Sequence, residues 1–78
     1  MAIEYEDQTA RLSGFIGVED AEGLLDWLQS HPKGCVDLAD CAHLHAANLQ
    51  VLMAAAPAIA AWPAEADLAA WLGSALPS

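Results

Sequence analysis

The chain has 78 residues, of which 56% are hydrophobic, and a formal net charge of −9 with Arg11 and Lys33 as its only fixed cations. A chain of this length forms one domain, residues 1–78, and its apolar content favours a packed globule over a disordered tail. So few cations remove the counterion release that drives binding to phosphate backbones, which argues against nucleic acid and anionic membranes as partners.

The first half of the chain predicts a hairpin followed by a helix. Residues 3–6 alternate apolar and acidic side chains, the pattern of a half-buried strand, and residues 7–9 supply a polar turn. Residues 12–16 fit a second strand that Gly17 ends. An apolar stripe at helical spacing then predicts a helix that stops before Pro32 and Gly34; it consists of Ala21, Leu24, Leu25 and Leu28.

The second half predicts two strand–helix pairs. Residues 35–39 fit a short central strand, and residues 46–56 a helix that Pro57 stops. Residues 58–62 fit a second parallel strand. A last helix, which contains Leu68, Trp71, Leu72 and Leu76, has Pro63 near its start and Gly73 near its end. The sequence therefore predicts an α/β fold with a small mixed β-sheet, helices packed mainly on one face, and the order β-β-α-β-α-β-α. Its core should comprise Leu24, Leu25, Leu28, Val36, Leu38, Leu49, Leu52 and Met53.

Two features bear on the cellular location. The first seven residues are acidic where a secretory signal carries a basic end. The longest stretch without a charged or strongly polar side chain, residues 51–64, is 14 residues long and contains two prolines, whereas a membrane helix needs about 20 apolar residues. We therefore expect a cytoplasmic protein without membrane insertion, in which Cys35 and Cys41 are reduced thiols.

Residues 36–52, VDLADCAHLHAANLQVL, resemble the signature of STAS domains, the fold shared by sulfate-transporter tails and anti-sigma-factor antagonists. In that family an apolar strand ending in Asp-Leu-Ser is followed by Asp-Ser-Ser/Thr-Gly-Leu and an apolar helix. Here the tetrad reads His45-Ala46-Ala47-Asn48. The resemblance implies a phosphate acceptor at the position of Ala46, but alanine has no hydroxyl, so serine phosphorylation cannot switch this chain at the family site.

Residues 41–64 contain no Asp, Glu, Lys or Arg. The outer side of the helix over 46–56 should therefore be neutral and made of small residues, including Asn48, Gln50, Ala54 and Ala55. Such a surface tends to be covered by a partner, although an alanine-rich helix that is simply soluble is the alternative.

The resemblance and this neutral surface together predict a non-enzymatic regulatory module that binds a protein and needs no cofactor. The family implies a kinase-like anti-sigma protein, a sensor or chemotaxis assembly, or a transporter complex as partner, and a homodimer is compatible with the sequence. The predicted binding residues lie at the start of the second long helix and just before it: His43, His45, Ala46, Ala47, Asn48 and Gln50.

The alternative is a small-ligand or metal-binding protein that uses Cys41, His43 and His45. With Cys35, four thiol or imidazole ligands lie within eleven residues, and three of them alternate, so that an extended turn could place them on one side. Cys41 and His43 also superficially resemble a nucleophile and its base, but residues two apart in a short turn rarely align for catalysis. A phosphohistidine at His43 or His45 is the covalent alternative that the sequence leaves open.

Overall fold

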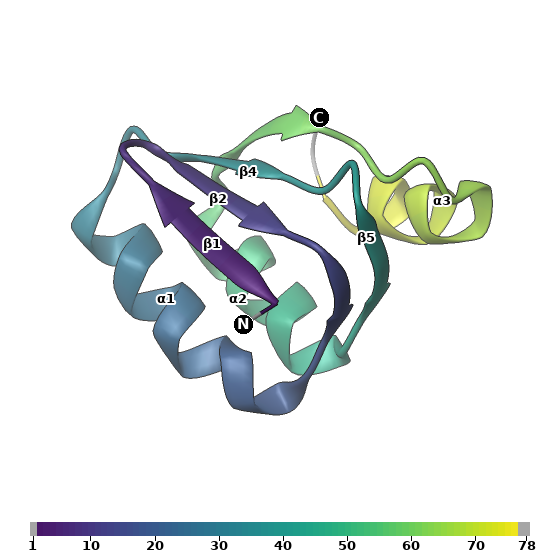
Figure 1. The fold of residues 1–78 in the computed structure, drawn as a ribbon, viewed down its shortest axis with the longest axis horizontal. Coiled ribbons are helices and arrows are strands. Elements are labelled where there is room, and N and C mark those ends of the chain that lie inside the picture. Colours follow the sequence, from purple (N-terminus) through teal and green to yellow (C-terminus); the bar gives the residue numbers. More distant parts are fainter. Residues whose placement is uncertain (1, 77–78) are drawn as a thin grey trace.

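The structure is a computed structural model that describes residues 2–76 (Figure 1). This part of the chain contains six strands, three α-helices and one short 3-10 helix. In chain order they are β1 (Ile3–Glu6), β2 (Thr9–Leu12), β3 (Gly14–Ile16), η1 (Val18–Asp20), α1 (Ala21–Ser30), β4 (Cys35–Asp37), β5 (Cys41–Leu44), α2 (Ala46–Ala55), β6 (Ala58–Ala61) and α3 (Ala66–Ala75).

β1 and β2 form the predicted hairpin, but its second strand begins at Thr9, which was predicted as part of the turn, and ends at Leu12. The strands are antiparallel, with Ile3 opposite Leu12 and Glu6 opposite Thr9, so that two residues make the turn. The first of them, Asp7, has a positive φ of 39°, which tight hairpin turns require and which aspartate tolerates. This register turns Ile3 and Leu12 into the core.

The main sheet has the strand order β1-β2-β4-β6, and the pairs β2/β4 and β4/β6 are parallel. Parallel neighbours need crossover connections, which α1 and α2 provide. These helices contact each other and lie side by side on one face of the sheet, whereas α3 lies at the other end of the molecule from α1 (Figure 1). The predicted α/β class, with a mixed sheet and a parallel strand at residues 58–61, is confirmed.

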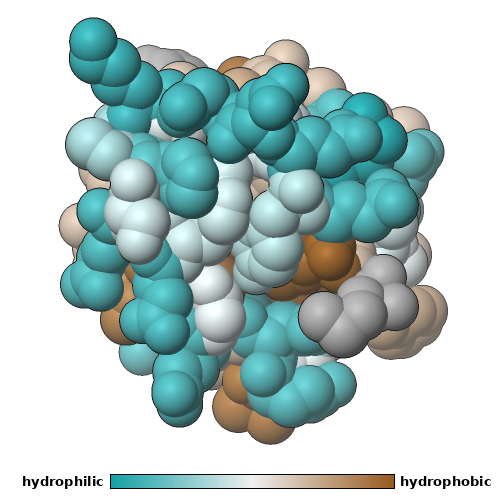
Figure 2. Space-filling model, turned by 60° about the vertical axis from the view of Figure 1, so that its left-hand side comes forward, coloured by the Kyte–Doolittle hydropathy of each residue, from teal (hydrophilic) through white to brown (hydrophobic). Residues whose placement is uncertain are grey.

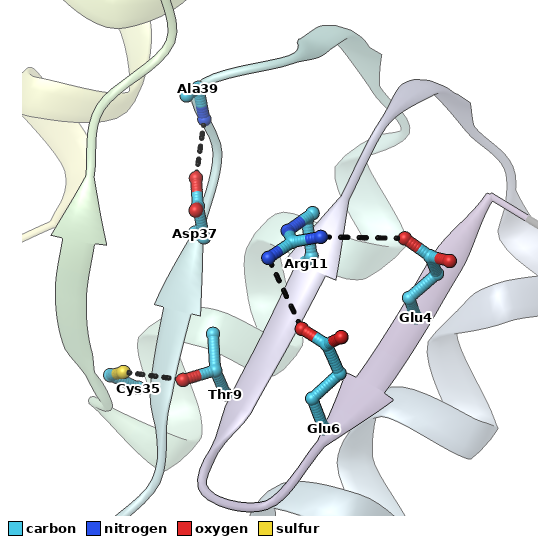
Figure 3. A network of polar contacts seen from close by, with 7 residues as sticks. All are labelled: Glu4, Glu6, Thr9, Arg11, Cys35, Asp37 and Ala39. Atoms are coloured by element: carbon cyan, nitrogen blue, oxygen red, sulfur yellow. Dashed lines mark hydrogen bonds and ion pairs between the residues drawn. The ribbon is translucent and has the colours of Figure 1, made fainter.

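The other face of the sheet carries polar side chains that are exposed or half-exposed. Arg11 on β2 reaches two carboxylates of β1, with N–O distances of 3.7 Å to Glu4 and 3.1 Å to Glu6 (Figure 3). On the same face, Cys35 Sγ lies 3.4 Å from Thr9 Oγ1 across the β2/β4 pair (Figure 3). Both cysteines are free in the structure.

Six of the eight predicted core residues are buried: Leu24, Leu28, Val36, Leu38, Leu49 and Leu52. The prediction was wrong for Met53, whose side chain is 50% exposed, and Leu25 is only half-buried. Nearly all residues of α2 are apolar, so the spacing of apolar residues does not show which of them face the core. The side of α2 that is buried is therefore narrower than the composition of the helix indicates.

The predicted second strand over residues 12–16 is broken. Gly14 has a φ of 67°, which favours glycine, and there the chain leaves the main sheet. β3 then pairs in parallel with β5, making a second, two-stranded sheet. The segment predicted as a turn before α2 is therefore a strand, because pairing with β3 orders residues 41–44.

The last helix, α3, begins shortly after Pro63 and has Gly73 near its end, as predicted. Its N-cap is Glu65, whose Oε2 accepts a 2.7 Å hydrogen bond from the Leu68 N–H. Its buried side, Leu68 and Leu72, joins the common core. None of the helices between residues 2 and 76 combines the length and the apolar character needed to cross a bilayer.

Candidate protein-binding site

The start of α2 is held in place by His45. This residue is the N-cap, with extended φ and ψ of −63° and 145°, and its Nδ1 accepts a 3.0 Å hydrogen bond from the Ala47 N–H. Its own N–H donates to the Ile16 carbonyl over 2.9 Å, which ties the helix start to β3. A side chain that caps a helix in this way satisfies one of the four N–H groups that lack a partner within the helix.

Asn48, in the first turn of α2, is fully buried. Its Nδ2 donates a 2.7 Å hydrogen bond to the Gly17 carbonyl, while its Oδ1 has no hydrogen-bond partner within residues 2–76. The predicted place of Asn48 on the outer side of the helix is therefore wrong. η1 packs against the start of α2 and covers the side of the helix from which Asn48 projects.

Two exposed apolar side chains lie beside the helix start. Phe15 on β3 is 75% exposed, and its ring lies 5.7 Å from that of His43, its neighbour on β5, with an interplanar angle of 36°. Val18 on η1 is 57% exposed. The sequence interpretation missed both residues. In an extended strand Leu12 and Ile16 face the same, buried side, and the two-residue period places Phe15 on the opposite side.

We call the exposed residues at this end the docking surface: Phe15, Val18, His43, His45, Ala46 and Gln50. Of the predicted binding residues, His43, His45, Ala46 and Gln50 lie on it, Ala47 is half-exposed at its border, and Asn48 lies beneath it. None of its members carries a fixed charge.

Most of the acidic residues lie elsewhere. Figure 2 brings forward the side on which α1 and the β1–β2 hairpin lie, and hydrophilic residues cover most of it. The exposed carboxylates of these elements and their turn are Glu4, Glu6, Asp7, Glu22 and Asp26. The fold thus gathers these carboxylates on one side, whereas the docking surface has no fixed charge of its own and carries large exposed apolar side chains. Two further carboxylates, Glu19 and Asp20 of η1, lie at its border next to Val18.

The geometry does not favour the metal-binding alternative. Cys41 is 2% exposed and faces the core, whereas His43 and His45 are exposed, so the three do not share a side as predicted. The reason is that residues 41–44 pair with β3 in an irregular register, which breaks simple alternation. Within residues 2–76, no three His, Cys, Asp or Glu side chains come close enough together to hold one metal ion.

Cys41 and His43 also do not form a nucleophile–base pair. The Cys41 Sγ contacts the backbone carbonyl of His43 at 3.5 Å, while the imidazole ring packs on Phe15. Burial raises the pKa of the Cys41 thiol, an effect that a hydrogen bond with the His43 backbone partly offsets. A buried, protonated thiol is a poor nucleophile.

In comparisons with known proteins, no family model, no curated protein and no solved structure matched the chain. The STAS resemblance of residues 36–52 thus stays a prediction, and the function has to be argued from the geometry of this chain.

Proposed function

We propose that this chain is a non-enzymatic regulatory module that binds a protein partner through the docking surface. The observation that carries the proposal is the pair Phe15 and His43, an aromatic contact exposed beside a capped helix start. Exposed aromatic side chains on an uncharged surface are typical of the centres of protein interfaces.

The rigidity of the surface also supports the proposal. Two hydrogen bonds hold the helix start to its neighbours, from the His45 N–H to the Ile16 carbonyl of β3 and from Asn48 Nδ2 to the Gly17 carbonyl, and a third, from the Ala47 N–H to His45 Nδ1, caps the helix. A surface that is ordered before binding loses little conformational entropy when the partner arrives. The geometry is therefore suited to docking a folded partner without rearrangement.

The resemblance to STAS domains suggests the settings in which such a partner would occur: a kinase-like anti-sigma protein, a sensor or chemotaxis assembly, or a transporter complex. The acidic side of the chain indicates a partner that is neutral or basic around the contact, because like charges across an interface oppose association. Two free cysteines fit a reducing compartment, and we propose the cytoplasm.

We further propose that binding is not controlled by serine phosphorylation at the family site, because Ala46 and Ala47 stand where the resemblance implies hydroxyl groups. Mass spectrometry of the protein from its native cells should find no phosphate on residues 36–53. A stoichiometric phosphohistidine at His43 or His45 would overturn this part of the proposal.

The docking surface can be tested before the partner is known. A photoreactive benzoylphenylalanine at Phe15 keeps the aromatic ring and should cross-link one discrete protein in native cells. The same group at Glu6, on the acidic hairpin, should not capture that protein. Cross-linking of the same protein from both positions, or of none from Phe15, would contradict the proposal.

A pair of charge variants sharpens this test. Ala46→Arg places a charge in the middle of the docking surface, where burying it without a partner is costly, and should abolish the cross-link from Phe15. Gln29→Arg adds the same charge at the exposed end of α1 and should leave the cross-link intact. Equal loss in both variants would point to a nonspecific effect of charge.

A further inference from the structure

The molecule has a second hollow, far from the docking surface. A cleft of about 280 Å³ lies where the last turn of α1, the loop before β4 and the end of α2 meet. Its walls include Leu28 and Gln29 of α1, His31 of the loop, and Ala55 and Pro57 at the end of α2. This volume is near the lower limit of small-molecule sites, so it suits a compact ligand.

Both crossover helices present their carboxyl ends to this cleft, because each leads into a strand of the same parallel set. The final carbonyls of a helix have no partners within it. At the end of α2, Ala56 has left-handed φ and ψ and its N–H returns to the Leu52 carbonyl over 2.8 Å. The next residue, Pro57, has no N–H with which to pair a further carbonyl.

At the end of α1, His31 is within hydrogen-bonding distance of two carbonyl oxygens of the helix. Its N–H donates to Leu28 O over 3.3 Å, and its Nδ1 lies 2.8 Å from Trp27 O. Neither bond reaches the carbonyls of Gln29 and Ser30. The ends of both helices therefore bring partial negative charge to the border of the cleft.

The helices carry no cation of their own to balance this charge. Neither α1 nor α2 has a basic residue in its last turn. Lys33 lies in the loop before β4, between Pro32 and Gly34, which both line the cleft, but its own side chain is exposed and does not line it. With a formal net charge of −9, the rest of the chain adds to the preference for a cation.

From this geometry we infer a binding site for a small amphipathic organic cation, of the alkylammonium class. Its apolar body packs against Leu28, Ala55 and Pro57, and its ammonium group faces the carboxyl ends of the two helices. Charge selects the ligand, because the same apolar walls would accept a neutral or anionic alkyl chain of equal size. The site lies at the opposite end of the helices from the docking surface and does not depend on the proposed function.

The inference is tested with hexylammonium, hexanol and hexanoate, which differ in charge and share the alkyl chain. Each is titrated into the 15N-labelled protein, and amide shifts are followed by NMR. Hexylammonium should give saturable shifts at Gln29, His31, Gly34 and Ala55. Its affinity should be about fivefold or more above that of hexanol, because its charge interacts favourably with the dipoles of two helix ends. Hexanoate should bind most weakly.

Two variants separate the cleft from general attraction to an acidic protein. Gln29→Lys supplies a cation at the end of α1 and should weaken hexylammonium binding by about threefold or more. Ala42→Lys changes the net charge equally at an exposed position of β5, outside the cleft, and should leave the affinity unchanged. Equal effects of the two variants, equal binding of hexanol and hexylammonium, or shifts centred on the acidic hairpin would each overturn the inference.

Discussion

Asn48 and Gly17, 31 residues apart in the chain, are joined by a 2.7 Å hydrogen bond from Asn48 Nδ2 to the Gly17 carbonyl oxygen. This bond fastens α2 to the segment between β3 and η1, and it lies beneath the docking surface. Because Asn48 is fully buried, its replacement tests the packing of this end of the molecule directly.

Asn48→Ala should lower the free energy of unfolding by about 1–3 kcal/mol, because the Gly17 carbonyl then loses its buried donor. Asn48→Asp should cost more, about 3–5 kcal/mol at neutral pH, because it buries a charge and directs an acceptor at an acceptor. Urea unfolding followed by circular dichroism measures both. If Asn48→Asp were as stable as the parent, the side chain could not lie where the structure places it.

Leu52 and Met53 are neighbours on α2 with opposite environments, since Leu52 is fully buried and Met53 is 50% exposed. Leu52→Ala should destabilise the protein by about 2–5 kcal/mol through lost apolar contacts and the cavity left behind. Met53→Ala, the matched control, should change stability by less than about 1 kcal/mol. The same urea experiment applies, and similar losses in the two variants would show that the helix is rotated from the described position.

His45 combines a capping bond with a place on the docking surface. His45→Ala should lower stability by about 0.5–2 kcal/mol, because the Ala47 N–H loses its acceptor. His45→Asp should keep or raise stability, since a carboxylate caps a helix start and suits its dipole. Thermal and urea unfolding of both variants measure this difference.

The same pair tests the docking surface once the partner is captured. His45→Asp should weaken binding at least about tenfold, or about 1.4 kcal/mol, although the variant is folded, because it buries a new charge in the interface. Isothermal calorimetry with the purified partner gives the affinity. Unchanged affinity would remove His45 from the interface.

Cys41 should make stability depend on pH in the alkaline range. Burial raises its pKa in the folded protein above the value of about 8.5 of an unfolded thiol. The contribution of the protonated thiol to the free energy of unfolding is therefore fully present below about pH 8.5 and is lost as the pH rises through the pKa of Cys41 in the folded protein. The reason is that the unfolded chain releases this proton more readily than the folded one.

The measurement compares urea midpoints at pH 7 and pH 9.5, with reductant present, for the parent and Cys41→Ala. The parent should lose more stability between these values than the variant. The pKa of Tyr5 is also raised, by burial and then by Asp20, but tyrosine titrates above about pH 10, so Tyr5→Phe should behave like the parent in this interval. Identical pH dependence of the parent and Cys41→Ala would mean that the thiol is accessible to water in the folded protein.

Much of the candidate site lay beyond what the sequence could predict. α2 was placed correctly from its apolar spacing and from Pro57 at its end, and with it the exposed positions of His45, Ala46 and Gln50. Phe15 was not recognised, because its exposure depends on β3 leaving the main sheet at Gly14. Asn48 was misplaced, because a helix with little amphipathic contrast does not reveal which of its sides η1 will cover.

Local sequence patterns were sufficient to predict an element wherever its residues showed one clear periodicity or a clear stop signal. Alternation in residues 3–6 and the leucine stripe of α1 predicted the type and the approximate bounds of these elements, since each depends on neighbours in the chain. The prolines on either side of β6 predicted its bounds, and its place after a strand–helix pair predicted its type. The uncharged run over residues 41–64 likewise determined that the exposed residues of β5 and α2 would carry no fixed charge.

Tertiary structure alone decided the features that depend on distant partners. Residues 41–44 are a strand because β3 pairs with them, Cys41 is buried while His43 is exposed because that pairing is irregular, and the cleft exists because two helices end at the same edge of the sheet. Each of these depends on contacts between segments far apart in sequence. A local sequence pattern does not show such contacts, so the sequence by itself determined the elements that depend on neighbouring residues, and the packing of distant segments decided β3, β5 and the two sites.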